Sequence, residues 1–292
     1  MNTNPDHNSV FIQLKDHSVS GESFELIHNE GMCRLETSPQ PSLESLPKYY
    51  QSEDYISHTD GRRNLFEKVY HQIKSVALNQ KLRLINSFRT ESKTLLDIGC
   101  GTGDFLQICK KNGWTITGIE PDQNARTLAK TKTKSPEIFH TTELLNLPKH
   151  SFDVITLWHV LEHLPNLDNH AKVIQQLLKP NGRVVVAVPN YQSYDARYYK
   201  QFWAAYDVPR HLWHFSQEGI SKLFQQVDIK VIKTKPMWFD AFYVSLLSEK
   251  YKTGKMNFIN GFWVGLCSNW KAIRSKEASS LIYVLKNIEN LK

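Results

Sequence analysis

Apolar residues follow two alternating patterns along most of this chain. From residue 94 onward, short apolar runs are separated by stretches in which apolar residues recur every three or four positions. The runs predict buried strands, and the stretches between them predict helices that cover a sheet. Strands are expected at residues 94–98, 115–119, 152–158, 183–188, 229–234 and 280–285. This alternation is typical of an α/β fold in which a mostly parallel sheet carries helices on both faces.

Residues 1–60 do not share this alternation. They mix short apolar groups with Pro39, Pro41 and Pro47, a composition that favours turns. Helical spacing begins near residue 65 and leads to the first strand of the main pattern. We therefore expect an appended N-terminal segment over residues 1–60 and one main domain over residues 61–292.

Aromatic side chains gather between the last two expected strands. Nine of them fall between Trp238 and Trp270, and we expect a helical insertion at about residues 237–275. Packing of these side chains against the core is one explanation. A cover over a substrate and contact with a membrane surface are two others.

Charge and cysteine content narrow the possible partners. The chain has 36 Lys and Arg against 29 Asp and Glu, a net charge of +7. Its densest basic stretch, Lys130, Lys132 and Lys134, falls where a helix should end, and cations are favourable there. Nucleic acid is therefore not the expected partner.

The four cysteines are far apart and form no CxxC pair. Neither a disulfide scaffold nor a cysteine-rich zinc site is expected, and we predict no metal. Unpaired cysteines are typical of a reducing compartment, so a cytoplasmic location is expected. The longest strongly apolar run, residues 184–188, is too short to cross a bilayer, and no signal peptide is visible.

The most informative motif is a glycine-rich turn directly after the first expected strand of the main domain. Residues 95–105 read LLDIGCGTGDF. Glycines let a backbone approach a ligand closely, and free amides at the start of a helix favour a carboxylate or phosphate. Asp97 precedes the turn, and Glu120 ends the next expected strand, where a carboxylate can accept hydrogen bonds from ribose hydroxyls. The pattern indicates a cofactor that contains a nucleoside.

The glycine spacing distinguishes between such cofactors. Dinucleotide sites usually space their glycines GxGxxG, whereas this chain has Gly99, Gly101 and Gly103. A nicotinamide-dependent oxidoreductase is therefore disfavoured.

The turn and its acid resemble the first motif of class I S-adenosylmethionine-dependent methyltransferases. The resemblance covers about residues 90–235, and residues 207–216 are similar to the branch that includes ubiquinone-biosynthesis-like enzymes. It implies a Rossmann-like seven-stranded, mostly parallel sheet with an N-terminal extension and a helical insertion before the last strand. It also implies S-adenosylmethionine as the cofactor. The cofactor-binding residues that follow from it are Asp97, Gly99, Cys100, Gly101, Gly103, Glu120, Pro121, Glu143, Trp158 and His159.

Several histidines are candidates for a base that activates a methyl acceptor, because imidazole titrates near neutral pH. The candidate catalytic residues are His159, His163 and His211. Polar and aromatic residues mix in residues 203–215, which suits an acceptor pocket. The candidate substrate-binding residues are Asp207, Arg210, His211 and His214. A buried structural ion pair between Asp207 and Arg210 is the alternative.

These observations predict a cytoplasmic S-adenosylmethionine-dependent methyltransferase that acts on an oxygen or carbon atom of a small or lipid-like acceptor. Peripheral contact with a membrane is compatible with the aromatic insertion. An RNA or protein methyltransferase and a non-catalytic S-adenosylmethionine-binding protein remain open alternatives. Methylation of a base amine is disfavoured, because the family motif for that chemistry is replaced here by Trp158-His159-Val160.

Overall fold

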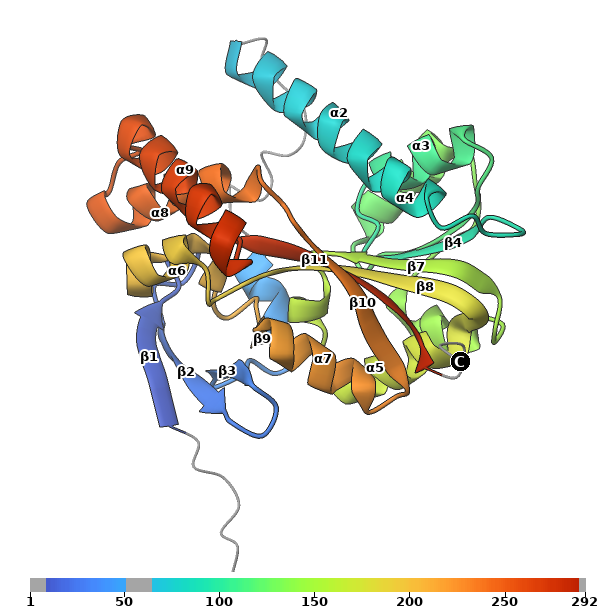
Figure 1. Ribbon diagram of the computed structural model, residues 1–292, viewed down its shortest axis with the longest axis horizontal. Helices are drawn as coiled ribbons and strands as arrows, with labels where there is room; N and C mark the ends of the chain where they lie inside the picture. Colours follow the sequence, from blue (N-terminus) through green and yellow to red (C-terminus); the bar gives the residue numbers. More distant parts are fainter. Residues whose placement is uncertain (1–8, 51–64, 289–292) are drawn as a thin grey trace, which may run out of the picture.

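A seven-stranded sheet forms the centre of the main domain in the computed structural model, which describes residues 9–50 and 65–288 (Figure 1). The strand order is β10-β11-β8-β7-β4-β5-β6. Only β11 runs antiparallel to its neighbours, β8 and β10, within this sheet. The strands are β4 (Thr94–Ile98), β5 (Thr115–Ile119), β6 (Ile138–Phe139), β7 (Phe152–Trp158), β8 (Leu178–Pro189), β10 (Ile229–Pro236) and β11 (Ser280–Asn287). The predicted α/β fold with a mostly parallel seven-stranded sheet is confirmed.

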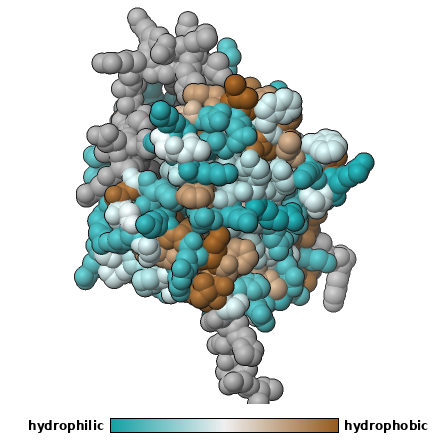
Figure 2. All heavy atoms as spheres, turned by 90° about the vertical axis from the view of Figure 1, so that its left-hand side faces the viewer, coloured by the Kyte–Doolittle hydropathy of each residue, from teal (hydrophilic) through white to brown (hydrophobic). Residues whose placement is uncertain are grey.

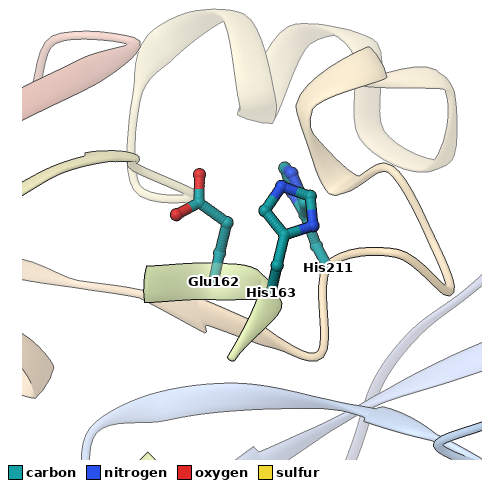
Figure 3. A group of neighbouring side chains, drawn as sticks. All are labelled: Glu162, His163 and His211. Atoms are coloured by element: carbon teal, nitrogen blue, oxygen red, sulfur yellow. The ribbon is translucent and has the colours of Figure 1, made fainter. Parts of the chain in front are cut away.

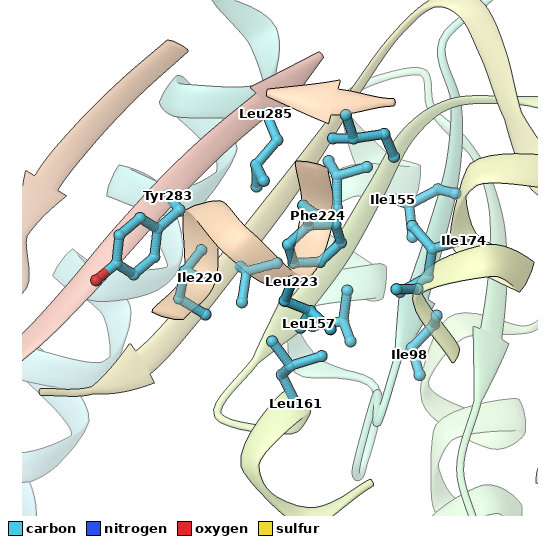
Figure 4. Close-up of a cluster of buried hydrophobic side chains, with 14 of the residues drawn as sticks. Ile98, Ile155, Leu157, Leu161, Ile174, Ile220, Leu223, Phe224, Tyr283 and Leu285 are labelled. Atoms are coloured by element: carbon cyan, nitrogen blue, oxygen red, sulfur yellow. The ribbon is translucent and has the colours of Figure 1, made fainter. Parts of the chain in front are cut away.

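Helices cover both faces of this sheet, because alternate residues of a strand point to opposite sides. Leu95 and Val154 pack against one group of helices, whereas Leu96 and Ile155 pack against the other. The first group comprises α2 (Leu65–Asn86), α3 (Asp104–Lys111) and α4 (Gln123–Thr133), and the second comprises α5 (Leu167–Leu177) and α7 (Gln217–Gln225). Figure 4 shows the second core, where Leu223 and Phe224 of α7 lie among Leu157, Leu161 and Ile174. This double burial explains why the strands have continuous apolar sequences.

A second, antiparallel sheet joins the N-terminal residues to the main domain. Its order is β1-β2-β3-β9, and β9 comes from the middle of the chain. The strands are β1 (Ser9–Lys15), β2 (Ser23–Asn29), β3 (Arg34–Ser38) and β9 (Trp213–Phe215), and η1 (Leu46–Tyr50) follows β3. Leu26 and Leu35 share a buried cluster with Trp203 and Val264. The boundary expected at residue 60 lies outside the described residues.

The aromatic insertion between β10 and β11 forms two helices, α8 (Asp240–Thr253) and α9 (Phe258–Ser275), as predicted. Between β8 and β9 lie α6 (Tyr194–Tyr199), η4 (Lys200–Phe202) and η5 (Ala204–Tyr206). The short turns η2 (Thr141–Asn146) and η3 (Leu161–His163) follow β6 and β7. None of the helices in the described part of the chain is long and apolar enough to cross a bilayer. All four cysteines are free.

Candidate functional site

The glycine-rich turn between β4 and α3 is tightly packed on one side and open on the other. Gly99, Gly101 and Gly103 all have positive φ, at 73°, 52° and 79°. A Cβ on Gly99 would lie 2.3 Å from Val160 Cγ2, and a Cβ on Gly103 would lie 2.9 Å from Ala129 Cβ. A Cβ on Gly101 would have no heavy atom within 4 Å. The backbone is therefore accessible to a ligand at Gly101.

Asp97 lies on β4 next to this turn and is almost completely buried. Its Oδ1 accepts a hydrogen bond from Thr156 Oγ1 at 2.6 Å. Burial raises the pKa of Asp97 to about 7, although the Thr156 bond and the positive charge of Lys81 oppose this rise. The carboxylate would be stabilised by a ligand that brings a positive charge, such as an amino group.

Glu120 follows β5 and contacts the turn directly. Its Oε2 accepts a hydrogen bond from the Gly101 amide at 2.9 Å, and its Oε1 accepts one from the Asp122 amide at 3.0 Å. Burial raises its pKa, although these two bonds oppose the rise. Each carboxylate oxygen can accept a further bond, so the fixed side chain can still receive two ribose hydroxyls.

Trp158 at the end of β7 adds an aromatic wall with an unused donor. Its ring packs edge-on against Phe105, with ring centroids 5.6 Å apart. Its indole Nε1 is buried and has no acceptor among the described residues. A buried donor without a partner is unfavourable, so this group also points to a ligand.

Lys81 of α2 belongs to the same site, although no sequence motif indicated it. Its Nζ lies 4.4 Å from the centroid of the Trp158 ring and interacts electrostatically with Asp97 and Asp240. Burial lowers the pKa of Lys81, and the two carboxylates oppose this effect. Only the amphipathic pattern of α2 preceded it in the sequence, and that pattern does not distinguish a site residue from a surface lysine.

The remaining cofactor candidates have different surroundings. Cys100 is buried, and burial raises the pKa of its thiol, which remains neutral. Gly118 of β5 leaves room for it, because a Cβ there would lie 2.8 Å from Cys100 Sγ. Pro121 and Glu143 are exposed, and Glu143 lies on η2, where it accepts a hydrogen bond from Asn146. Thus Cys100 packs beneath the turn, whereas Pro121 and Glu143 have surfaces that a ligand could contact.

His159 is held between two carboxylates and has a positive φ of 57°. Its Nε2 lies 3.1 Å from Asp240 Oδ2, and its Nδ1 lies 3.5 Å from Glu162 Oε1. Burial would lower the pKa of His159, but the two carboxylates outweigh it and raise the pKa to about 10. The imidazole is therefore a cation near neutral pH. Asp240, at the start of α8, was not identified from the sequence, because it lies far from β7 along the chain.

Glu162, His163 and His211 form a compact group behind His159 (Figure 3). One ligand atom from each lies within 4.8 Å of the others, the closest approach to a metal site found among the described residues. His163 Nδ1 lies 3.0 Å from the Arg210 carbonyl oxygen, and His211 Nδ1 lies 2.9 Å from that of Ala205. Burial and the charge of His211 lower the pKa of His163 to about 4. The structure thus unites the three candidate catalytic histidines around Glu162, while the expectation of no metal stays a prediction.

The candidate acceptor residues make extensive contacts within the protein. Arg210 is buried, and its guanidinium donates to both carboxylate oxygens of Asp207, to the Tyr49 carbonyl oxygen and to Ser18 Oγ. His214 Nε2 lies 3.1 Å from Thr37 Oγ1 in the sheet with β3. These contacts agree with the alternative of a structural ion pair. Residues 207–215 thus connect the N-terminal sheet to the main domain.

The sheet order with one antiparallel strand, the glycine turn and the two acids after β4 and β5 define a Rossmann-like methyltransferase fold. Residues 69–234 match the family model described as a methyltransferase domain. This match covers more than half of the chain, and the protein belongs to this family.

Two curated relatives show the same relationship. A ubiquinone biosynthesis O-methyltransferase of Vibrio cholerae serotype O1 is 33% identical over 129 residues, which cover 42% of this chain and 52% of that protein. The protein of the same name from Hydrogenovibrio crunogenus is 28% identical over 123 residues, covering 39% and 51%. The chain thus spans about half the length of the curated relatives it matches.

Solved structures share the fold at low sequence identity. A magnesium protoporphyrin IX methyltransferase from Synechocystis PCC 6803 with bound SAH aligns with a TM-score of 0.54 and 12% identity, covering 83% of this chain and 98% of that one. A SAM-dependent methyltransferase from Archaeoglobus fulgidus has a TM-score of 0.51 and 15% identity, covering 77% and 100%.

Proposed function

We propose that this protein transfers a methyl group from S-adenosylmethionine to an oxygen or carbon atom of a small or lipid-like acceptor. The observation that best supports this function is the pair of buried carboxylates, Asp97 and Glu120, at the ends of neighbouring strands beside the open backbone of Gly101. One carboxylate suits an amino group, and the other suits the two hydroxyls of a ribose.

The residues of the site fit such a cofactor. Asp97 and the open turn at Gly101 would hold its amino-acid end, and Glu120 would hold its ribose. The unpaired indole N–H of Trp158 offers a further donor. We retain Glu143 as the residue for the adenine amine, since its exposed carboxylate lies on η2, which contacts β5.

When bound, S-adenosylmethionine supplies a methyl carbon that its sulfonium has already activated. The protein must then align the acceptor atom and hold it in a nucleophilic form. His159 is about a third exposed and carries its proton near neutral pH. We infer that it stabilises the negative charge of a deprotonated acceptor oxygen instead of acting as the base. Asp240 and Glu162 fix its position, and His163 and His211 support Glu162.

An oxygen acceptor is favoured over carbon, because both curated relatives are O-methyltransferases. We keep Asp207, Arg210, His211 and His214 as the lower wall of an acceptor pocket, although their contacts are mainly structural. The prediction of a cytoplasmic location is also kept, and the four free cysteines are consistent with it.

The proposal is tested by calorimetric titration with S-adenosylhomocysteine and by release of that product from labelled S-adenosylmethionine with catechol-type and quinol-type acceptors. Gly101→Val should abolish binding. Gly254→Val is the matched control, because Gly254 also has a positive φ, of 76°, with open space around its Cα. Unchanged affinity in Gly101→Val would contradict the proposed site, and binding without turnover on any acceptor would contradict catalysis.

A further inference from the structure

Helix α9 has its small residues on the inside and its large apolar residues on the outside. The buried face consists of Gly261, Val264, Gly265, Ser268 and Ala272. A Cβ on Gly261 would lie 3.0 Å from Leu246 Cα, and one on Gly265 would lie 3.0 Å from Phe242 Cα. The α9 backbone therefore packs closely on α8 and needs none of its large side chains for this contact.

The outer face of α9 is apolar along the whole helix. With about 100° per residue, its large apolar side chains occupy a sector of about 140°. These side chains are Phe258, Ile259, Phe262, Trp263, Leu266, Trp270 and Ile273, each between 40% and 76% exposed. A helix that only packs against a core would turn this sector inward. So large an exposed apolar surface is typical of a docking site.

Neighbouring residues of the hairpin extend this surface, which we call the hairpin patch. Trp238, Phe239 and Tyr243 near the start of α8 and Met256 before α9 are also exposed. In the space-filling view of this side, brown side chains gather at the upper edge of the described surface (Figure 2).

The charges around the hairpin patch are positive. Helix α9 contains no Asp or Glu and ends with Lys271, Arg274 and the following Lys276. Lys252 and Lys255 are exposed at the other end, near Met256. The two acids of α8 are engaged inside, Asp240 with His159 and Glu249 with Asn260. An apolar face with basic flanks complements an anionic lipid surface, in which aromatic side chains insert among the headgroups.

We propose that the hairpin patch docks on the surface of an anionic lipid bilayer, with α9 lying in the plane of the headgroups. A second copy of this chain is a poorer occupant, because two such patches face to face would bring the basic flanks together. Asp240 connects the hairpin to His159 at 3.1 Å, so docking places the candidate site beside the bilayer. The docking itself does not depend on methyl transfer, whereas delivery of a lipid-like acceptor from the bilayer rests on the proposed function.

The test is flotation of the full chain with vesicles of phosphatidylcholine alone or with 30% phosphatidylglycerol. We expect binding to the anionic vesicles, weakened by salt. Ile259→Asp and Trp263→Asp should each weaken it by about tenfold or more, since each removes an inserted apolar side chain. Leu128→Asp is the matched control, because Leu128 is an exposed apolar residue on α4, at the other side of the molecule (Figure 1).

Two further measurements separate the possible explanations. Affinity for S-adenosylhomocysteine should be equal in the wild type and in both hairpin variants, which shows that they are folded and keeps this test apart from the proposed function. Light scattering reports the oligomeric state. Absence of flotation with anionic vesicles, equal flotation of the hairpin variants and wild type, or a dimer that both variants dissociate would overturn the proposal.

Discussion

Replacing Asp97 by Asn should weaken cofactor binding and remove most of its dependence on pH. The wild-type carboxyl has a pKa of about 7 because it is buried on β4. A ligand with a positive amino group binds the ionised form, so the affinity should follow the ionised fraction of Asp97. That fraction falls from about one half at pH 7 to about one tenth at pH 6, which predicts an affinity loss of about fivefold.

The same substitution should stabilise the folded protein above pH 7. Because the pKa is raised from 3.8, the folded state retains a proton that the unfolded state has lost, and stability decreases as the pH rises from 3.8 to about 7. The difference between the two pKa values corresponds to at most about 4 kcal/mol. Asn keeps an oxygen that can accept the Thr156 hydrogen bond and has no charge to bury, so Asp97→Asn should recover part of this free energy.

Calorimetric titrations with S-adenosylhomocysteine between pH 6 and 7.5, together with urea unfolding at pH 5 and 8, measure both effects. Asp168→Asn is the control, because Asp168 is an exposed acid in the first turn of α5. If the wild-type affinity is constant over this pH range, or if Asp97→Asn keeps the same pH dependence as the wild type, the assignment of Asp97 is incorrect.

Three further outcomes follow from the site. Lys81→Met removes a positive charge near Asp97, so the midpoint of the pH dependence of ligand affinity should move to higher pH; an unchanged midpoint would exclude their interaction. His159 has a pKa raised to about 10, so its contribution to stability is complete below 6.5 and is lost as the pH rises through 10; His159→Gln should lack that loss in urea unfolding at pH 7 and 10.5, and a parallel decrease in both proteins would contradict the pairing. Arg210→Ala leaves its buried carboxylate partner unpaired and should lower the free energy of unfolding by about 3–5 kcal/mol, measured in urea, whereas a loss below 1 kcal/mol would show that the pair is not structural.

The central sheet could be predicted from local sequence. The expected bounds of residues 94–98, 115–119 and 152–158 coincide with β4, β5 and β7. These strands are buried on both faces, so each is a continuous apolar run that needs no knowledge of its partners. The glycine turn was equally visible, because its backbone requires positive φ at Gly99, Gly101 and Gly103.

The second sheet and the surroundings of the site depended on tertiary structure. Strand β9 has three residues, too few for a periodic pattern, and it exists because β3 pairs with it from a distant part of the chain. Arg210 suggested an acceptor pocket, but its partners Tyr49 and Ser18 come from the N-terminal region.

Sequence alone therefore determined the strands and the turn, whose structure depends on neighbouring residues and on burial. The fold decided which charges meet. Lys81 and Asp240 lie on α2 and α8, and their effect on Asp97 and His159 exists only where these helices pack beside the ends of the strands. A pKa depends on distances and burial in space, and neither is encoded in the spacing of residues along the chain.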